Sequence, residues 1–358
     1  MNKLQKRDLQ NITILFLISR LLLIVFIIMN KNISFLNVYD AEHYLTIAET
    51  GYSKELLYAF FPLYPLLIRL FHIIIPSYEA SAIILSNIFS YLSVLVLYLI
   101  IDNKNKNKMY IIIAYIFSPN LVFNSIAYTE SLYLLLTLLS YYLYINKKYL
   151  LCGIFLGLSM ITRNTGIVLL GAIGLKMLYD LYKKNIKFKD IVLLSIPTAI
   201  IGFSYPIYLL ITTGDFFKYI NVQYTHWGRI SSNIISILIR DIEFLINNHN
   251  NVPYYYVFIQ NWLFYFIALF LAIKYFKKET VFSIYIIVSL LLFTTTCRDY
   301  TWNTIPSVSF FRYVFGLFPV YLLPFINEKK KYNIVIIILY LSLSIMNSIL
   351  VFGNAFIA

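Results

Sequence analysis

Residues 11–29 read NITILFLISRLLLIVFIIM, and Arg20 is the only charged side chain among them. A bilayer core requires roughly 20 apolar residues in a helix that crosses it, so this stretch is long enough to span a membrane. It lacks a small-residue cleavage site, and we interpret it as a retained first span. Because an unpaired cation is unfavourable in lipid, we expect Arg20 to face the interior of a helical bundle.

The rest of the chain has the same apolar character. Of its 358 residues, 60% are hydrophobic and only 13% are charged, whereas soluble domains carry about 25% charged residues. This balance predicts an all-α integral membrane protein, a single polytopic domain over residues 1–358 with about 11 membrane-spanning helices. We expect these spans at residues 11–29, 81–101, 109–123, 131–145, 149–162, 165–182, 191–212, 253–273, 280–296, 311–326 and 332–353.

The formal net charge of +13 arises largely in alternate connections between these spans. An excess of Lys and Arg marks cytoplasmic loops, so the charge indicates topology rather than a nucleic-acid partner. With this orientation the N-terminus is cytoplasmic and the C-terminus is not. The basic residues that define the cytoplasmic side are Lys3, Lys6, Arg7, Lys104, Lys106, Lys108, Lys147, Lys148, Lys183, Lys184, Lys187, Lys189, Lys274, Lys277, Lys278, Lys329, Lys330 and Lys331.

Residues 61–75 form a shorter apolar segment that contains Pro62 and Pro65. If this segment crossed the membrane, the lysines of the next connection would lie on the wrong side. We therefore expect an interfacial or re-entrant piece that is buried by protein, where irregular backbone is tolerated. Two longer connections, residues 30–60 and 214–252, fall on the extracytoplasmic side and are long enough to fold over a site.

The first outer connection contains the sequence DAEHY at residues 40–44. Apolar residues recur at positions 41, 44, 45 and 48, which predicts a short surface helix that ends at Gly51. Asp40 stands where an N-cap belongs, and an ionised carboxylate there suits either capping or general-base catalysis. By default Glu42 is a solvated helix residue and His43 a surface histidine. No metal-ligand spacing is present, so we expect no cofactor, although the sequence leaves a divalent cation open.

Further polar residues fall on the same side of the predicted membrane. Each is compatible with an ordinary helix end or a snorkelling side chain, but together with Asp40 they indicate a site. Arginines on this side do not contribute to the cytoplasmic excess of basic residues, but they could bind an anionic head group. We interpret as substrate-binding candidates Glu130, Arg163, Asn164, His226 and Arg312, and we place Arg298-Asp299 in the same region.

These motifs, taken in order, resemble the GPI mannosyltransferase II (PIG-V-like) family. The resemblance runs from the first span to about residue 171 and is fainter beyond it. Tyr39 departs from the usual motif, in which Trp is common, and the compact chain resembles the prokaryotic members. The motifs that carry the resemblance are DAEHY at 40–44, IAETGY at 47–52, FFPLYP at 60–65, SPN at 118–120, YTES at 128–131 and TRNTG at 162–166.

The resemblance implies a GT-C-type multi-span helical bundle with a catalytic carboxylate in the first outer loop. It also implies a polyprenyl- or dolichyl-phosphate donor, typically of mannose, and a glycolipid or glycan acceptor. Asp40 then takes the catalytic-base position, with Glu42 and His43 in the same motif. Because a phosphate leaving group is already a stable anion, one carboxylate base is sufficient, and we expect inversion. Arg163 and Arg312 are the candidates to hold the donor phosphate.

The main alternative is a transporter or flippase of an anionic or isoprenoid-linked lipid. It would explain the spans and the outer arginines, but the chain lacks the inverted repeat of many such proteins and the reading gives Asp40 no role. A structural membrane subunit would not need so many polar clusters on one face. We expect a multi-pass protein among membrane lipids, in the cell membrane if prokaryotic or the endoplasmic reticulum membrane if eukaryotic.

The charge pattern predicts that Lys147 faces the cytoplasm and that Asp40 and Arg163 face the opposite side. Single cysteines at positions 40, 147 and 163, in a variant without Cys152 and Cys297, should react accordingly with an impermeant maleimide added to intact cells. Labelling of positions 40 and 147 from the same side would contradict this topology.

Overall fold

The computed structural model describes residues 6–30, 39–101, 105–248, 252–299, 302, 304–326 and 329–353. Lys3, Lys104, residues 31–38 of the first outer connection and residues 249–251 of the second lie outside the described residues. The helices are α1 (Lys6–Asn30), α2 (Asp40–Thr50), η2 (Glu55–Ala59), α3 (Leu63–His72), α4 (Tyr78–Ile100), α5 (Lys108–Ile116), α6 (Glu130–Ile145), α7 (Tyr149–Met160), α8 (Gly166–Tyr182), α9 (Phe188–Gly202), α10 (Ser204–Thr213), α11 (Lys218–Thr225), α12 (Ile234–Asn247), α13 (Val252–Lys274), α14 (Thr280–Phe293), α15 (Phe310–Phe315), η4 (Phe318–Tyr321), η5 (Leu323–Phe325) and α16 (Lys330–Phe352).

The described chain is a helical membrane protein. Five helical segments are long and apolar enough to cross a bilayer, namely Lys6–Met29, Tyr78–Ile100, Phe188–Thr213, Val252–Lys274 and Lys330–Phe352. Helices α6, α7 and α14 are apolar but shorter, so the expectation of about 11 spans is not confirmed.

Two predicted spans differ from the structure. Within residues 109–123, helix α5 ends at Ile116 and buried turns follow it. Residues 311–326 contain the short helix α15 and the two 3-10 helices η4 and η5, which begin near Pro319 and Pro324. Proline lacks an amide hydrogen and disrupts a continuous helix. Both stretches are apolar because they are buried inside the protein, and hydropathy alone does not separate that burial from contact with lipid.

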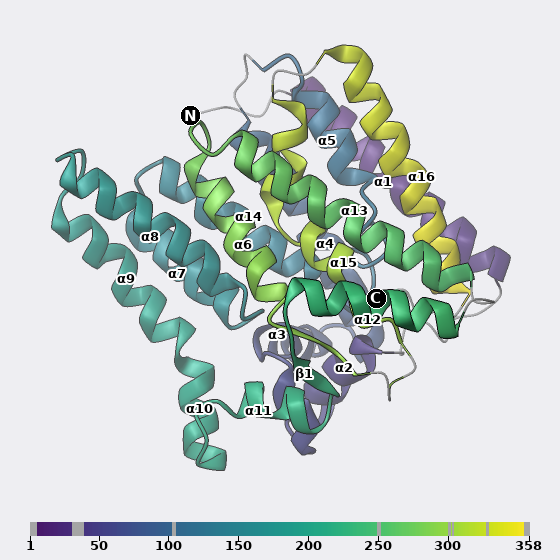
Figure 1. Ribbon diagram of the computed structural model, residues 1–358. Coiled ribbons are helices and arrows are strands. Elements are labelled where there is room, and N and C mark those ends of the chain that lie inside the picture. Colours follow the sequence, from purple (N-terminus) through teal and green to yellow (C-terminus); the bar gives the residue numbers. More distant parts are fainter. Residues whose placement is uncertain are drawn as a thin grey trace.

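The helices pack as a bundle with α7, α8 and α9 together at one edge and α1 and α16 at the opposite edge (Figure 1). Helices α7 and α9 approach very closely. A Cβ on Gly153 would lie 2.2 Å from the Leu194 carbonyl oxygen, and one on Gly157 would lie 2.7 Å from the Ile201 Cβ. This small-xxx-small spacing is the pattern that lets membrane helices pack backbone to backbone.

Arg20 of α1 turns toward helix α4, as expected of a cation within a span. Its Nη2 donates to the Ser90 hydroxyl at 2.6 Å, and its guanidinium lies 4.1 Å from the centre of the Phe16 ring. The sequence alone did not identify a partner for Arg20, and the structure shows that it is the Ser90 hydroxyl on α4.

The proline-containing segment 61–75 forms helix α3, which packs against α2 and α4. Arg69 donates to the Ala48 and Ile47 carbonyl oxygens at 2.6 and 3.2 Å, which satisfies the C-terminal end of α2. The Tyr64 hydroxyl lies 2.7 Å from the Ser86 hydroxyl on α4. Helix α3 therefore fixes α2, and with it the DAEHY motif, to the bundle.

The second outer connection is ordered by a feature that the all-α expectation did not include. Strand β1 (Arg229–Ser231) pairs antiparallel with β2 (Thr296–Arg298), which follows α14. Helix α11 precedes β1 in the chain and α12 follows it. Helix α11 contacts η2, which belongs to the first outer connection. Helix α11 also contacts β1 (Figure 1), and Trp227, two residues before β1, packs against His43 of α2. The two outer connections consequently meet next to Asp40.

Candidate functional site

Asp40 is the first residue of helix α2, and its carboxylate points at an arginine from the far end of the chain. Arg312 of α15 donates from Nη2 to Asp40 Oδ2 at 2.7 Å. The predicted capping role of Asp40 is wrong, because Tyr39 occupies the N-cap position with φ 56° and Asp40 follows it inside the helix. A carboxylate in the first turn is still stabilised by the positive end of the helix dipole.

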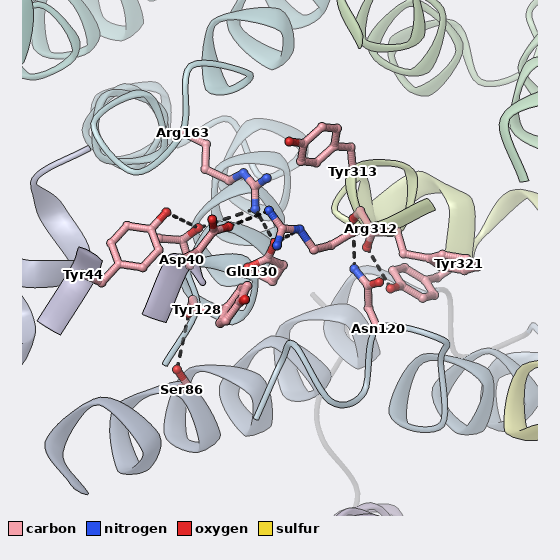
Figure 2. A network of polar contacts seen from close by, with 12 residues as sticks. Asp40, Tyr44, Ser86, Asn120, Tyr128, Glu130, Arg163, Arg312, Tyr313 and Tyr321 are labelled. Carbon is pink, nitrogen blue, oxygen red and sulfur yellow. Dashed lines mark hydrogen bonds and ion pairs between the residues drawn. The ribbon is translucent and has the colours of Figure 1, made fainter. Parts of the chain in front are cut away.

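Glu130 lies at the centre of the same network. It is the first residue of α6, and its side chain is 1% exposed. Its Oε1 lies 2.7 Å from Arg163 Nη1 and 3.1 Å from Arg312 Nε, so one carboxylate oxygen is shared by two guanidinium groups. Figure 2 shows Asp40, Arg312, Glu130 and Arg163 in one connected cluster. The structure therefore brings together four of the residues predicted from sequence.

Aromatic rings enclose this cluster. The Arg312 guanidinium carbon lies 5.2 Å from the Tyr128 ring centre and 5.5 Å from that of Tyr313. Tyr44, one helical turn after Asp40, places its hydroxyl 3.4 Å from the Thr129 hydroxyl. Aromatic faces attract guanidinium groups and also exclude water, which strengthens the ion pairs.

Opposing effects act on the protonation of Asp40. Burial alone would raise the pKa of Asp40, but the charge and hydrogen bond of Arg312, helped by Arg163 and His43, hold that pKa below its ordinary value. The carboxylate is therefore ionised at neutral pH. Because the folded-state pKa is lowered, the stability that Asp40 contributes is present above its ordinary pKa and is lost as the pH falls through the folded-state value.

His43 lies beside the cluster, in contact with two aromatic rings. Its ring centre is 4.9 Å from those of both Phe60 and Trp227. Burial lowers the pKa of His43 despite the nearby charges of Asp40 and Glu42, so the imidazole is neutral at pH 7. His43 thus lies near Asp40 as a neutral ring packed between aromatic side chains.

Three predicted site residues are not joined to the cluster. Glu42 is exposed on the outer face of α2, since a residue two positions after Asp40 points to another side of a helix. Asn164 is exposed as well. His226 lies 3.5 Å from Glu55 of η2, which also pairs with Lys218. His226 therefore helps to hold the second outer connection against the first.

Two site residues were missed by the sequence reasoning. Tyr313 adjoins Arg312, and its ring centre lies 5.4 Å from the Arg163 guanidinium carbon. Arg229 of β1 donates from Nη2 to the Tyr313 hydroxyl at 3.2 Å. The adjacency of Tyr313 to Arg312 was a usable signal, whereas the position of Arg229 depends on a strand pairing that its local sequence does not reveal.

Within the described residues, no group of three or more His, Cys, Asp or Glu side chains is arranged to hold a metal ion. Both carboxylates of the cluster, Asp40 and Glu130, are paired with arginine side chains. The same guanidinium groups could bind an anion that competes with these carboxylates.

Comparison with known families finds that the family described as mannosyltransferase (PIG-V) matches residues 21–295. The match includes Asp40, Glu130, Arg163 and Arg229 and ends before Arg312 and Tyr313. No curated protein and no solved structure matches the chain significantly. The structure therefore adds Arg312 and Tyr313 to the matched part of the site.

The geometry predicts that Arg312→Ala lowers the free energy of unfolding by about 3 kcal/mol, because removing one partner leaves buried charge uncompensated. This lies at the low end of the usual range, since the Asp40 side chain is 28% exposed and Arg163 still reaches Glu130. Arg312→Lys should recover part of the loss.

Thermal unfolding of the purified protein in detergent would measure both changes. Lys176→Ala is the matched control, because Lys176 forms a more exposed pair with Asp180, one turn along α8, at 2.6 Å. Its loss should amount to about 0.5 kcal/mol or less. Equal, small effects for the two alanine variants would contradict a structural role for the Arg312 bridge.

Proposed function

Because the chain belongs to the mannosyltransferase (PIG-V) family, we propose that it moves a mannosyl group from a polyprenyl-phosphate donor to a glycolipid or glycan acceptor. The family assignment makes the protein a membrane-bound glycosyltransferase and does not favour the transporter alternative. The observation that carries the proposal is Asp40, an ionised carboxylate at the start of α2 within an arginine-rich, aromatic-lined cluster.

The proposed reaction is a single displacement at the anomeric carbon. An acceptor hydroxyl oxygen attacks that carbon while the bond to the phosphate oxygen breaks, and the electron pair of this bond leaves with the phosphate. The acceptor proton passes to the Asp40 carboxylate, which acts as the general base. The product is a mannoside of inverted configuration together with the polyprenyl phosphate, and no second carboxylate acid is required.

Arg312 links donor binding to the strength of the base. With Arg312 bonded to it, Asp40 has a lowered pKa and is a weak proton acceptor. A donor phosphate would compete for the Arg312 and Arg163 guanidinium groups, because phosphate accepts strong charge-assisted hydrogen bonds. Loss of the Arg312 bond would raise the pKa of Asp40 and make it a better base. Donor binding would thereby activate the catalytic carboxylate.

The form of the donor follows from the predicted topology. Nucleotide sugars are made in the cytoplasm and are hydrophilic, whereas Asp40 is predicted on the opposite side. A donor used there arrives on a lipid, with its chain in the bilayer and its phosphate at the interface. We expect the reaction on the outer face of the cell membrane if the protein is prokaryotic, or on the lumenal face of the endoplasmic reticulum membrane if it is eukaryotic.

Asp40→Asn should keep helix α2 in place, because the amide has nearly the same shape and its oxygen can still accept from Arg312. It should nevertheless lower kcat about 10²–10⁴-fold, the usual contribution of a positioned base. Transfer of labelled mannose in purified membranes would measure this. Glu49→Gln, on an exposed position of the same helix, is the matched control and should retain activity. Near-normal turnover of Asp40→Asn would exclude Asp40 as the base.

The purified protein should transfer mannose from polyprenyl-phosphate mannose and not from GDP-mannose once synthesis of the lipid donor is blocked. With the lipid donor, Arg312→Ala should raise KM more than it lowers kcat, and Arg312→Lys should restore part of the affinity. Direct and efficient use of GDP-mannose would contradict the proposed donor class, whatever the behaviour of Asp40 variants.

A further inference from the structure

Two arginines face each other across the β1–β2 ribbon. The register pairs Arg229 directly with Arg298. Residues that are directly opposite in an antiparallel pair project from the same face with their Cβ atoms about 5 Å apart, and like charges in this arrangement are destabilising. An uncompensated pair of this kind is unfavourable for folding and indicates another role.

Neither arginine forms an ion pair within the described residues, although the more distant charge of Asp40 also acts on Arg298. The ion pairs at the site join Asp40 to Arg312 and Glu130 to Arg312 and Arg163, and none includes Arg229 or Arg298. Arg298 Nε is buried and has no hydrogen-bond partner. Burial, with the neighbouring charge of Arg229, lowers the pKa of Arg298 to about 10, so it still carries its charge at neutral pH.

The pair is continuous with the catalytic cluster. Arg229 donates to the Tyr313 hydroxyl at 3.2 Å, and the Tyr313 ring lies 5.4 and 5.5 Å from the guanidinium carbons of Arg163 and Arg312. Figure 2 shows Tyr313 beside Arg312. Three arginines thus contact Tyr313, and Arg298 lies opposite one of them, Arg229. These four arginines outnumber the two carboxylates of Asp40 and Glu130, and an anionic ligand would supply further negative charge.

Trp302 holds Arg298 in place. The Arg298 guanidinium carbon lies 4.7 Å from the centre of the Trp302 ring. Trp302 in turn packs against Gly228, whose φ is +58°, so closely that a Cβ on Gly228 would lie 1.7 Å from the indole nitrogen. A guanidinium group fixed by stacking loses little conformational freedom when it binds an oxyanion.

We propose that Arg229, Arg298 and the Tyr313 hydroxyl form an anion subsite that binds the phosphate ester of a lipid substrate. This inference rests on the proposed glycosyl transfer, in which either the donor or a phosphate-bearing acceptor supplies the ester. Guanidinium groups match phosphate geometry, and two of them on one strand pair can hold separate oxygens of the same group. The subsite adds binding residues to those of the catalytic cluster and takes no part in proton transfer.

Direct binding tests the subsite without requiring catalysis. The full-length protein in detergent is titrated with farnesyl phosphate, which has the chemistry of a donor without the sugar, and with short-chain phosphatidylglycerol, which represents a glycerolipid phosphate. Tryptophan fluorescence reports binding, since the chain has three tryptophans and Trp302 stacks on Arg298. Arg229→Gln and Arg298→Gln should each weaken binding about 10–100-fold, whereas Lys54→Gln, at an exposed position, should not.

A second variant separates ligand binding from a structural role. Arg298→Glu creates an opposite-charge pair with Arg229, so it should unfold at a temperature no lower than that of the wild type while it loses phosphate binding. A large fall in unfolding temperature for Arg298→Gln and Arg298→Glu alike would make Arg298 structural and overturn the proposal.

The two probes identify the source of the phosphate. Tighter binding of farnesyl phosphate that depends on Arg229 and Arg298 assigns the subsite to the donor. Tighter binding of phosphatidylglycerol with the same dependence assigns it to the acceptor. If neither probe binds, or if binding is insensitive to both glutamine substitutions, the subsite does not exist. Because no sugar transfer is measured, this failure is distinct from a failure of the proposed mannosyl transfer.

Discussion

The shared ion pair of Arg312 with Asp40 and Glu130 determines how the site is assembled. Asp40 and Arg312 are 272 residues apart in the sequence, and Glu130 lies on a third element between them. Charges this deep in a protein are tolerated only when they are paired. Helices α2, α6 and α15 must therefore converge at one point, and α3 holds α2 there through Arg69 and Tyr64. The DAEHY motif at residues 40–44 is positioned by electrostatics as much as by apolar packing.

Both carboxylates of the cluster occupy the first residue of a helix. The positive end of a helix dipole stabilises negative charge, so both helix starts are favourable places for a carboxylate. Arg163 lies in the hydrogen-bonded turn between α7 and α8, where its amide donates to the Ser159 carbonyl oxygen at 3.0 Å and its side chain reaches inward to Glu130. The polar site is therefore built from helix ends that meet, while the apolar helix middles form the bundle.

Sequence reasoning succeeded where a local pattern had a single structural solution. The apolar spacing at residues 41, 44, 45 and 48 predicted the buried face of α2. The predicted topology, together with the family resemblance, grouped Asp40, Glu130, Arg163 and Arg312, and the structure brings these four side chains together. It failed where the outcome depended on tertiary contacts. Apolar runs such as 311–326 are buried in protein as short helices, and the β1–β2 pairing, which brings Arg229 to Tyr313, leaves no trace in local propensity. Glu42 and His226 have suitable chemistry but lie on elements that point them elsewhere.

In the proposed reaction, the excess of arginine over carboxylate would let one site be stable at rest and reactive when it is occupied. Arg312 holds the pKa of Asp40 below its ordinary value, which keeps the carboxylate ionised and would also weaken it as a base. The like charges of Arg229 and Arg298, which face each other across the ribbon, are tolerated because the surrounding fold fixes the two strands. An anion bound at the proposed subsite would relieve this repulsion and compete with Asp40 for Arg312. Binding energy from the phosphate would then be used to release the base at the moment when the acceptor hydroxyl needs it, which couples substrate recognition to proton transfer.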